Sequence, residues 1–104
     1  MYALIVTYTS AVPAEQMRDA QLAFAERVVA VPGFVSKTWL RHESTLGGFY
    51  VFDSRDAAEA FAQGPLFASL RDAPVVSDLT VREFSVLGDL STLTGVDVPV
   101  AHVT

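Results

Sequence analysis

The stretch PGFVSKTWLRHESTLGGFYVFDSRDAAEAF, residues 32–61, decides the fold that this sequence predicts. It holds two runs rich in β-branched and aromatic residues, a polar segment that ends in Gly-Gly, and an alanine-rich segment. This pattern predicts a β-hairpin that leads into a helix. We expect strands over residues 34–42 and 48–52, with the segment ESTLGG, residues 43–48, forming the turn.

The segments on either side of the hairpin complete a βαββαβ order. Residues 2–9 and 75–87 are rich in β-branched residues and predict strands, and apolar residues recur at helical spacing after Pro13. The second helix is expected to be capped by Asp53 or Ser54 and broken at Gly64-Pro65. This order predicts an α+β, ferredoxin-like fold with a four-stranded antiparallel sheet and two helices on one face.

The other face of the sheet should also be covered. The first and third strands are apolar on both sides, and the chain is 51% hydrophobic but only 18% charged. A second subunit stacked sheet to sheet would bury this surface, so we expect a homodimer. Residues 1–90 form the expected domain. Residues 91–104 are valine-rich without a helical period, and they form either an arm onto the partner or a disordered tail.

Composition narrows the possible partners and locations. The net charge is −5 and no basic run occurs, which argues against nucleic-acid binding. The chain has no cysteine, so disulfides and thiolate sites are excluded. The apolar run at the start is too short for a membrane span and lacks the basic front of a signal peptide. We therefore expect a cytoplasmic protein with no membrane partner.

Lys37, Trp39 and Arg41 are the first candidate site residues. They lie at alternate positions and therefore share one face of their strand. If that face is turned toward the helices, Trp39 is either core or the wall of a ligand pocket with cations nearby. If it is turned outward, the three residues form a solvent or dimer-contact row.

Other aromatic residues pose a similar choice. The hydroxyls of Tyr8 and Tyr50 either serve as polar handles in the core or hold a phenol or carbonyl group of a ligand. Phe24, Phe61 and Phe67 are expected in the helix core, and the same residues would line any pocket between helices and sheet.

No motif for a metal or cofactor is present. The two histidines, His42 and His102, have no metal-ligand spacing, and we expect His42 to be exposed near the hairpin turn. There is no G-x-S-x-G motif, phosphate loop or dinucleotide fingerprint. The expectation is therefore a protein without metal, flavin or nicotinamide.

Four segments within residues 31–95 carry a resemblance to a known family, and the likeness extends from residue 2 to about residue 95. They are VPGFVSKTWL, LGGFYVFDSRDAAEAF, GPLFASL and VREFSVLGDLSTLTG. They are similar to the YdhR-type monooxygenases of the dimeric α+β barrel superfamily. The resemblance implies a homodimer of stacked sheets, with a pocket in each subunit between the sheet and the helices.

The resemblance also implies an activity, because structural relatives of this family oxygenate anthrones without metal or flavin. It implies catalytic roles for Trp39, Tyr50 and Arg41, with His42 a weaker match. The expected function is a cofactor-independent monooxygenase that uses O₂ on a small aromatic or polyketide-like substrate. A polyketide cyclase or isomerase and a non-catalytic module for apolar ligands are the alternatives. The expected substrate-binding residues are Tyr8, Phe24, Lys37, Phe61 and Phe67.

Overall fold

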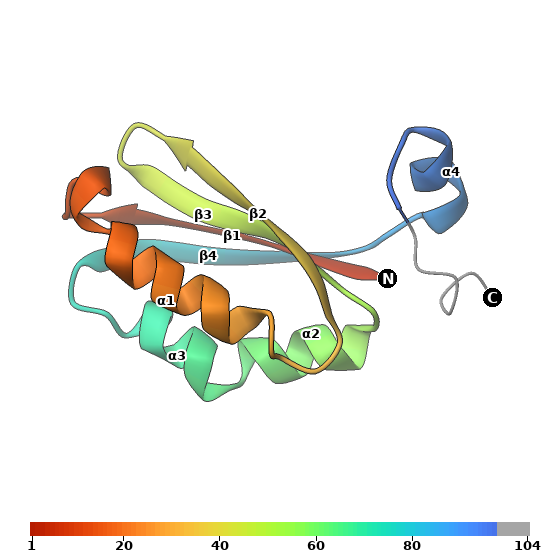
Figure 1. Ribbon diagram of the computed structural model, residues 1–104, viewed down its shortest axis with the longest axis horizontal. Coiled ribbons are helices and arrows are strands. Elements are labelled where there is room, and N and C mark those ends of the chain that lie inside the picture. Colours follow the sequence, from red (N-terminus) through yellow and green to blue (C-terminus); the bar gives the residue numbers. More distant parts are fainter. Residues whose placement is uncertain (98–104) are drawn as a thin grey trace.

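The computed structural model describes residues 1–97, apart from the side chain of Ala14 (Figure 1). Four strands form one antiparallel sheet in the order β2-β3-β1-β4. The strands are β1 (Tyr2–Ser10), β2 (Phe34–His42), β3 (Thr45–Phe52) and β4 (Val76–Ser85). This arrangement confirms the α+β, ferredoxin-like fold expected from the sequence.

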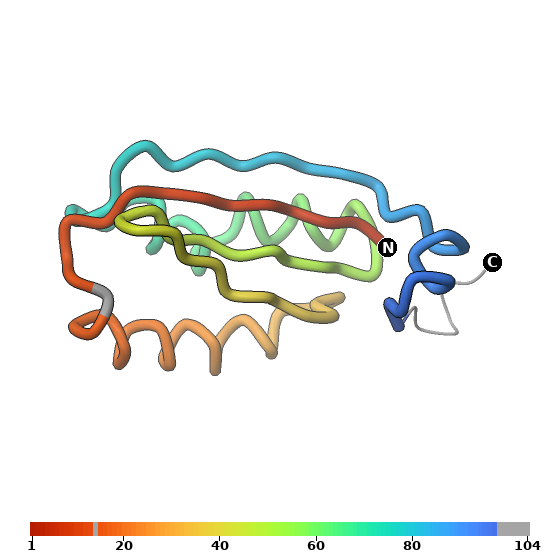
Figure 2. The backbone as a smooth tube through the Cα atoms, turned by 90° about the horizontal axis from the view of Figure 1, so that it is seen from above, coloured from red at the N-terminus to blue at the C-terminus, as the bar shows by residue number. Residues whose placement is uncertain are grey.

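Helices cover one face of the sheet (Figures 1 and 2). A short 3₁₀ turn, η1 (Ala14–Gln16), leads into α1 (Arg18–Val28), and α2 (Arg55–Ala62) is followed by α3 (Pro65–Arg71). Ser54 caps α2 by accepting a hydrogen bond from the Ala57 N–H at 3.1 Å. The break at Gly64-Pro65 separates α2 from α3 as expected, since proline suits a first helical turn.

The core lies between the two central strands and the helices. Leu4 and Val6 of β1 and Tyr50 and Phe52 of β3 are at most 1% exposed. Their helical partners are Val28 of α1, Ala58 and Phe61 of α2, and Phe67 of α3. Because side chains of a strand alternate between faces, the residues between these four point to the opposite face of the sheet.

That opposite face carries apolar side chains that the described part of the chain leaves exposed. The solvent-exposed fractions of three of these residues are 40% for Leu40, 37% for Phe49 and 44% for Phe84. A cavity of about 550 Å³ lies between this face and the segment that follows β4. Its lining includes Ile5, Phe49 and Leu90, so the apolar face continues onto that segment.

The hairpin turn is shorter than the sequence predicted. β3 begins at Thr45, so Gly47 and Gly48 lie within the strand and not in the turn. Glu43 adopts a left-handed φ of 55° at the tight connection. A Cβ at Gly47 would overlap the carbonyl oxygen of Val6. The glycine therefore permits close approach of β1 and β3, which the Gly-Gly pair alone does not reveal.

The segment after β4 forms a short helix, α4 (Gly88–Leu93), which the sequence reading did not predict. Its six residues are too few to display a helical period, and it crosses the expected boundary at residue 90. In Figure 1, α4 projects from the end of the sheet away from α1. The part of the expected arm from residue 98 onward, with His102, lies outside the described residues.

Candidate functional site

The row of Lys37, Trp39 and Arg41 faces the helices. In the β2–β3 register these residues pair with Tyr50, Gly48 and Leu46, which are buried. The structure thus settles the question of orientation that the sequence left open. Trp39 remains 41% exposed, so it stands at the border of the core and not inside it.

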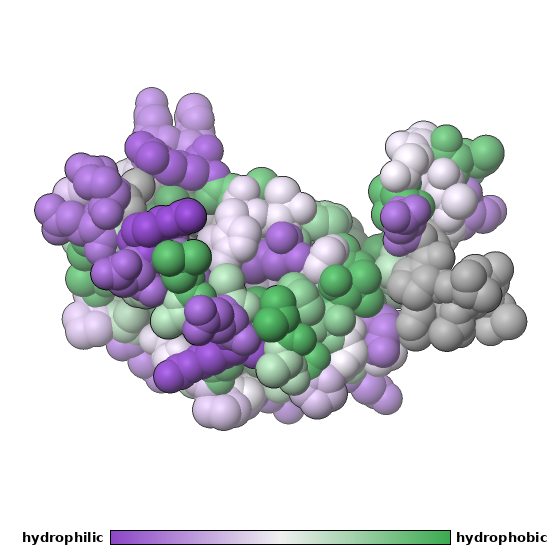
Figure 3. Space-filling model, viewed as in Figure 1, coloured by the Kyte–Doolittle hydropathy of each residue, from purple (hydrophilic) through white to green (hydrophobic). Residues whose placement is uncertain are grey.

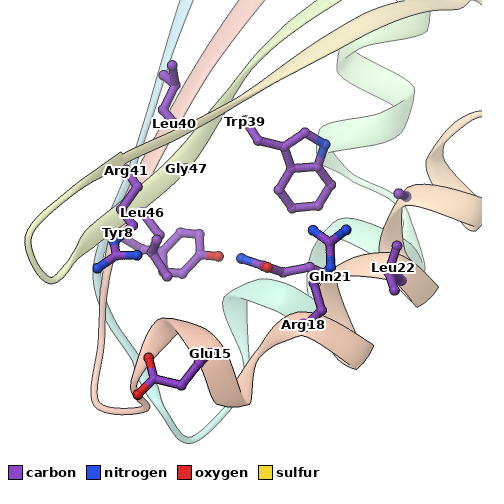
Figure 4. Close-up of a pocket in the computed structure, with 11 residues that line it drawn as sticks. Tyr8, Glu15, Arg18, Gln21, Leu22, Trp39, Leu40, Arg41, Leu46 and Gly47 are labelled. Atoms are coloured by element: carbon purple, nitrogen blue, oxygen red, sulfur yellow. The ribbon is translucent and has the colours of Figure 1, made fainter.

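An open cleft of about 700 Å³ lies between this row and α1 (Figure 4). Trp39 forms one wall, and the side chains of Tyr8 and Gln21 point toward each other across the cleft. The lining residues are Tyr8, Glu15, Arg18, Gln21, Leu22, Ala25, Trp39, Leu40, Arg41, Leu46 and Gly47. In Figure 3, hydrophilic residues gather at the end of the molecule that holds the β2–β3 turn and the start of α1.

A second, smaller cavity of about 220 Å³ adjoins the cleft. Tyr8, Gln21 and Trp39 line both spaces, so the two lie next to each other at these side chains. The remaining lining residues are Met17, Ala20, Phe24, Lys37, Ser69, Leu70, Ala73, Val75 and Val76. The lining of this inner cavity is mostly apolar and comes largely from α1, α3 and the start of β4, and the cavity is partly open to solvent.

The amine of Lys37 lies among three aromatic rings. Its Nζ is 3.3 Å from the ring centroid of Trp39, 4.5 Å from that of Phe24 and 4.6 Å from that of Tyr50. Phe24 also packs edge-on against Trp39, with centroids 6.2 Å apart. We call these three rings the aromatic cage.

Burial in this cage lowers the pKa of Lys37 to about 7. The ring faces attract a cation and partly compensate its lost hydration, but they replace none of the strong hydrogen bonds that water provides. Both salt bridges among the described residues, Arg55–Glu59 and Arg71–Asp72, lie elsewhere. The amine therefore exchanges protons readily near neutral pH.

The two tyrosines differ in their access to the cavities. Tyr8 lines both, and burial raises the pKa of its hydroxyl. Tyr50 is 1% exposed and lines neither, and burial, with a contribution from Tyr8, raises the pKa of its hydroxyl strongly. Both phenols therefore stay protonated at neutral pH and can act only as hydrogen-bond donors or acceptors.

The other sequence candidates fall into three groups. Arg41 lines the outer cleft. Phe61 and Phe67 pack against each other in the core, with centroids 5.6 Å apart, and line neither cavity. His42 is exposed at the end of β2, as expected.

Sequence reasoning missed the contribution of α1 and η1. Glu15, Arg18 and Gln21 bring polar groups to the cleft from the helical side. Arg18 and Gln21 stand three residues apart on one helical face, which is a detectable signal. This spacing indicates a site only once the structure shows that this face of α1 lies opposite Trp39.

The described residues contain no cluster of three His, Asp or Glu side chains able to hold a metal ion. Over the same residues, no helix has the length and apolar character needed to cross a membrane.

One family matches nearly the whole chain. The family described as "Putative mono-oxygenase ydhR" covers residues 3–97. The chain belongs to this family. The match confirms the resemblance found in the four sequence segments, and it includes every residue of the cleft and of the aromatic cage. A comparison with the curated proteins finds no match.

Solved structures with the same fold include oxygenases and haem-binding proteins. A mutant of MhuD, a haem-degrader from Mycobacterium tuberculosis, holds two manganese protoporphyrins per active site. It is 26% identical, with a TM-score of 0.64 over 84% of this chain and 95% of that one. SnoaB, a cofactor-independent oxygenase from Streptomyces nogalater, is 19% identical, with a TM-score of 0.65 over 82% and 91%.

A third similar structure is a monooxygenase from the gene ActVA-Orf6 of Streptomyces coelicolor, solved with the ligand Nanaomycin D. It is 22% identical, with a TM-score of 0.61 over 82% of this chain and 86% of that one. At this identity, the likeness to the two Streptomyces proteins shows a shared fold.

Proposed function

We propose that this member of the monooxygenase family oxidises a small aromatic or polyketide-like substrate, such as an anthrone or hydroquinone, with O₂ and without metal or flavin. The observation that carries the proposal is the aromatic-lined inner cavity, which adjoins a more polar cleft at Trp39. Such a pair of spaces fits a flat apolar ring system with a polar edge. The cofactor independence of SnoaB agrees with a reaction without metal or flavin, and the Nanaomycin D bound by the ActVA-Orf6 protein agrees with a small-molecule substrate.

The chemistry suits a protein that supplies only a dry pocket and proton transfer. An anthrone loses a proton to give an electron-rich anion, which reduces O₂. The resulting peroxide collapses to the quinone carbonyl, and the second oxygen atom leaves as water. The site would have to exclude water from the inner cavity and stabilise the substrate anion.

Each candidate residue has a place in this scheme. Trp39 stacks on or orients the substrate ring, and Arg41 stabilises negative charge at the mouth of the cleft. Tyr8 donates a hydrogen bond from its raised-pKa hydroxyl. Because Tyr50 lines neither cavity, its part is to wall the amine of Lys37 and not to touch the substrate.

Haem is a less suitable ligand for these cavities. Haem iron is most often held by histidine or cysteine, and among the described residues neither type lines the cleft or the inner cavity. A polyketide cyclase or isomerase would use the same cavities without O₂, and a binding module would use them without turnover.

We also assign a homodimer to the open face of the sheet. Leu40, Phe49 and Phe84 are exposed there in the single chain. A second copy stacked on this face would cover them and leave the cleft, which lies on the helical side, accessible.

Oxygen consumption tests the proposed function. Purified protein is mixed with a panel of anthrones and hydroquinones in the presence of EDTA, and the emission of Trp39, the only tryptophan, is followed in the same samples. Protein-dependent uptake that survives EDTA is the expected result. A saturable change in Trp39 emission without oxygen uptake would instead favour the cyclase or the binding module.

A further inference from the structure

The chain has a single lysine, Lys37, and the fold places its amine at the wall of the inner cavity. The aromatic cage surrounds Nζ at 3.3 to 4.6 Å from the ring centroids. Among the residues that the structure describes, no carboxylate lines this cavity, and Glu15 lines the outer cleft instead. A solvated surface lysine has none of these features.

None of the described groups that face the amine from the surrounding elements is an anion that would hold it as an ammonium ion. Tyr8 comes from β1 and Tyr50 from β3, and both hydroxyls stay protonated because burial raises their pKa. The α1 side contributes the neutral Gln21 and Phe24, while α3 and the start of β4 contribute no ionisable side chain to the cavity. The cations Arg18 and Arg41 line the outer cleft and not this cavity.

We infer that Lys37 is the base that accepts the proton of an acidic aromatic hydroxyl or anthrone carbon bound in the inner cavity, and that the resulting ammonium then pairs with the substrate anion. The neutral amine offers a lone pair, and the substrate gives up one proton to it with no other bond change. The ammonium returns this proton to the peroxide. On collapse the O–O bond and the remaining C–H bond of the anthrone carbon break, the carbonyl forms, and the departing hydroxide takes that second proton and leaves as water. This inference rests on the proposed function for the oxidation step but not for the proton transfer.

The lowered pKa of Lys37, about 7, suits this role. A base works best when its pKa lies near the operating pH, because it is then both largely deprotonated and able to hold the proton that it takes. An ammonium within an aromatic cage is also short of hydrogen-bond acceptors, and a phenolate oxygen would supply one. The site therefore favours acidic aromatic hydroxyls over neutral hydrocarbons of the same shape.

The first arm of the test measures turnover. In oxygen uptake, the wild-type rate should rise with pH to a plateau, with an inflection near the pKa of Lys37. Lys37→Met should lower kcat by about 10²-fold or more, the usual contribution of a positioned base. Lys37→Arg should lower kcat as well, because a guanidinium stays protonated and cannot act as a base. Added methylamine should partly restore Lys37→Met, and Arg27→Met, a cation outside both cavities, is the matched control.

The second arm needs no turnover and uses 4-nitrophenol, whose phenolate absorbs visible light. Below the pKa of the free ligand, wild-type protein should convert bound ligand to phenolate, and Lys37→Met should bind it without the visible band. A band that persists in Lys37→Met, or no band with wild-type protein, would overturn the inference. Absent oxygen uptake together with a Lys37-dependent band would overturn the oxygenase proposal and leave the proton transfer supported.

Discussion

At the scale of single residues, the site depends on one lysine placed among aromatic rings. An isolated amine in an apolar space is unfavourable to folding, because its charged form loses hydration. Contacts of the Lys37 amine with the ring faces of Trp39, Phe24 and Tyr50 compensate only in part for this lost hydration. A group that lowers stability and has no partner is a sign of function rather than of structure.

The first prediction concerns the ionisation of this amine. Selective ¹⁵N labelling of lysine gives one side-chain signal, because the chain has one lysine. We expect this signal to titrate with a midpoint near 7. A midpoint near the ordinary value of 10.5 would contradict the burial of the amine.

The second prediction concerns stability and pH. The folded-state pKa of Lys37 lies below its unfolded value, so between pH 7 and 10.5 the unfolded chain binds more protons. Wild-type stability should therefore rise with pH across this window. Lys37→Met removes the penalty and should increase the free energy of unfolding below pH 7 by at least about 1.4 kcal/mol, the equivalent of one pKa unit. Denaturant unfolding at low and high pH measures this, and the gain should vanish above pH 10.5.

At the scale of elements, β2 and β3 place the site and α1 completes it. The register pairs Trp39 with Gly48, and a glycine there leaves room for the Lys37 side chain. The order of strands and helices along the chain, the cap and the helix break followed from local pattern, because each depends on residues close in sequence. The exact position of the turn did not, because Gly47 is required by its close contact with the backbone of β1, about 40 residues away in the sequence.

The third prediction separates the two neighbouring glycines. Gly47→Ala would drive a methyl group into the backbone of Val6, so it should cost about 2–3 kcal/mol of unfolding free energy. Gly48→Ala would meet the flexible end of Lys37 instead, so it should cost less and shift the Lys37 titration midpoint. Thermal unfolding and the ¹⁵N titration measure both effects. Equal destabilisation by the two substitutions would refute the distinction.

At the scale of the whole molecule, the two faces of the sheet differ in what they carry. The cleft and inner cavity lie between α1 and the sheet. The open face carries the exposed apolar residues, and these continue onto α4, where Leu90 and Leu93 are 56% and 83% exposed. An apolar surface of this extent is a candidate interface between subunits.

The fourth prediction tests that interface. Phe49→Glu puts a charge on the open face and should convert the proposed dimer to a monomer, with at least a tenfold weaker association. Val29→Glu, an equally drastic change at an exposed position just after α1, should leave the dimer intact. Sedimentation or light scattering decides the result. A wild-type monomer at high concentration would rule out the dimer itself.

The sequence by itself determined the fold class, the family and the shared face of Lys37, Trp39 and Arg41. The fold class and the shared face follow from local patterns, such as the period of two along a strand, and the family follows from the resemblance of four segments to known members. Only the tertiary structure decided that this face meets α1, that Phe61 and Phe67 line neither cavity, and that Lys37 lies within the aromatic cage. Burial and pKa depend on neighbours from distant parts of the chain, and no local pattern encodes which elements will supply them.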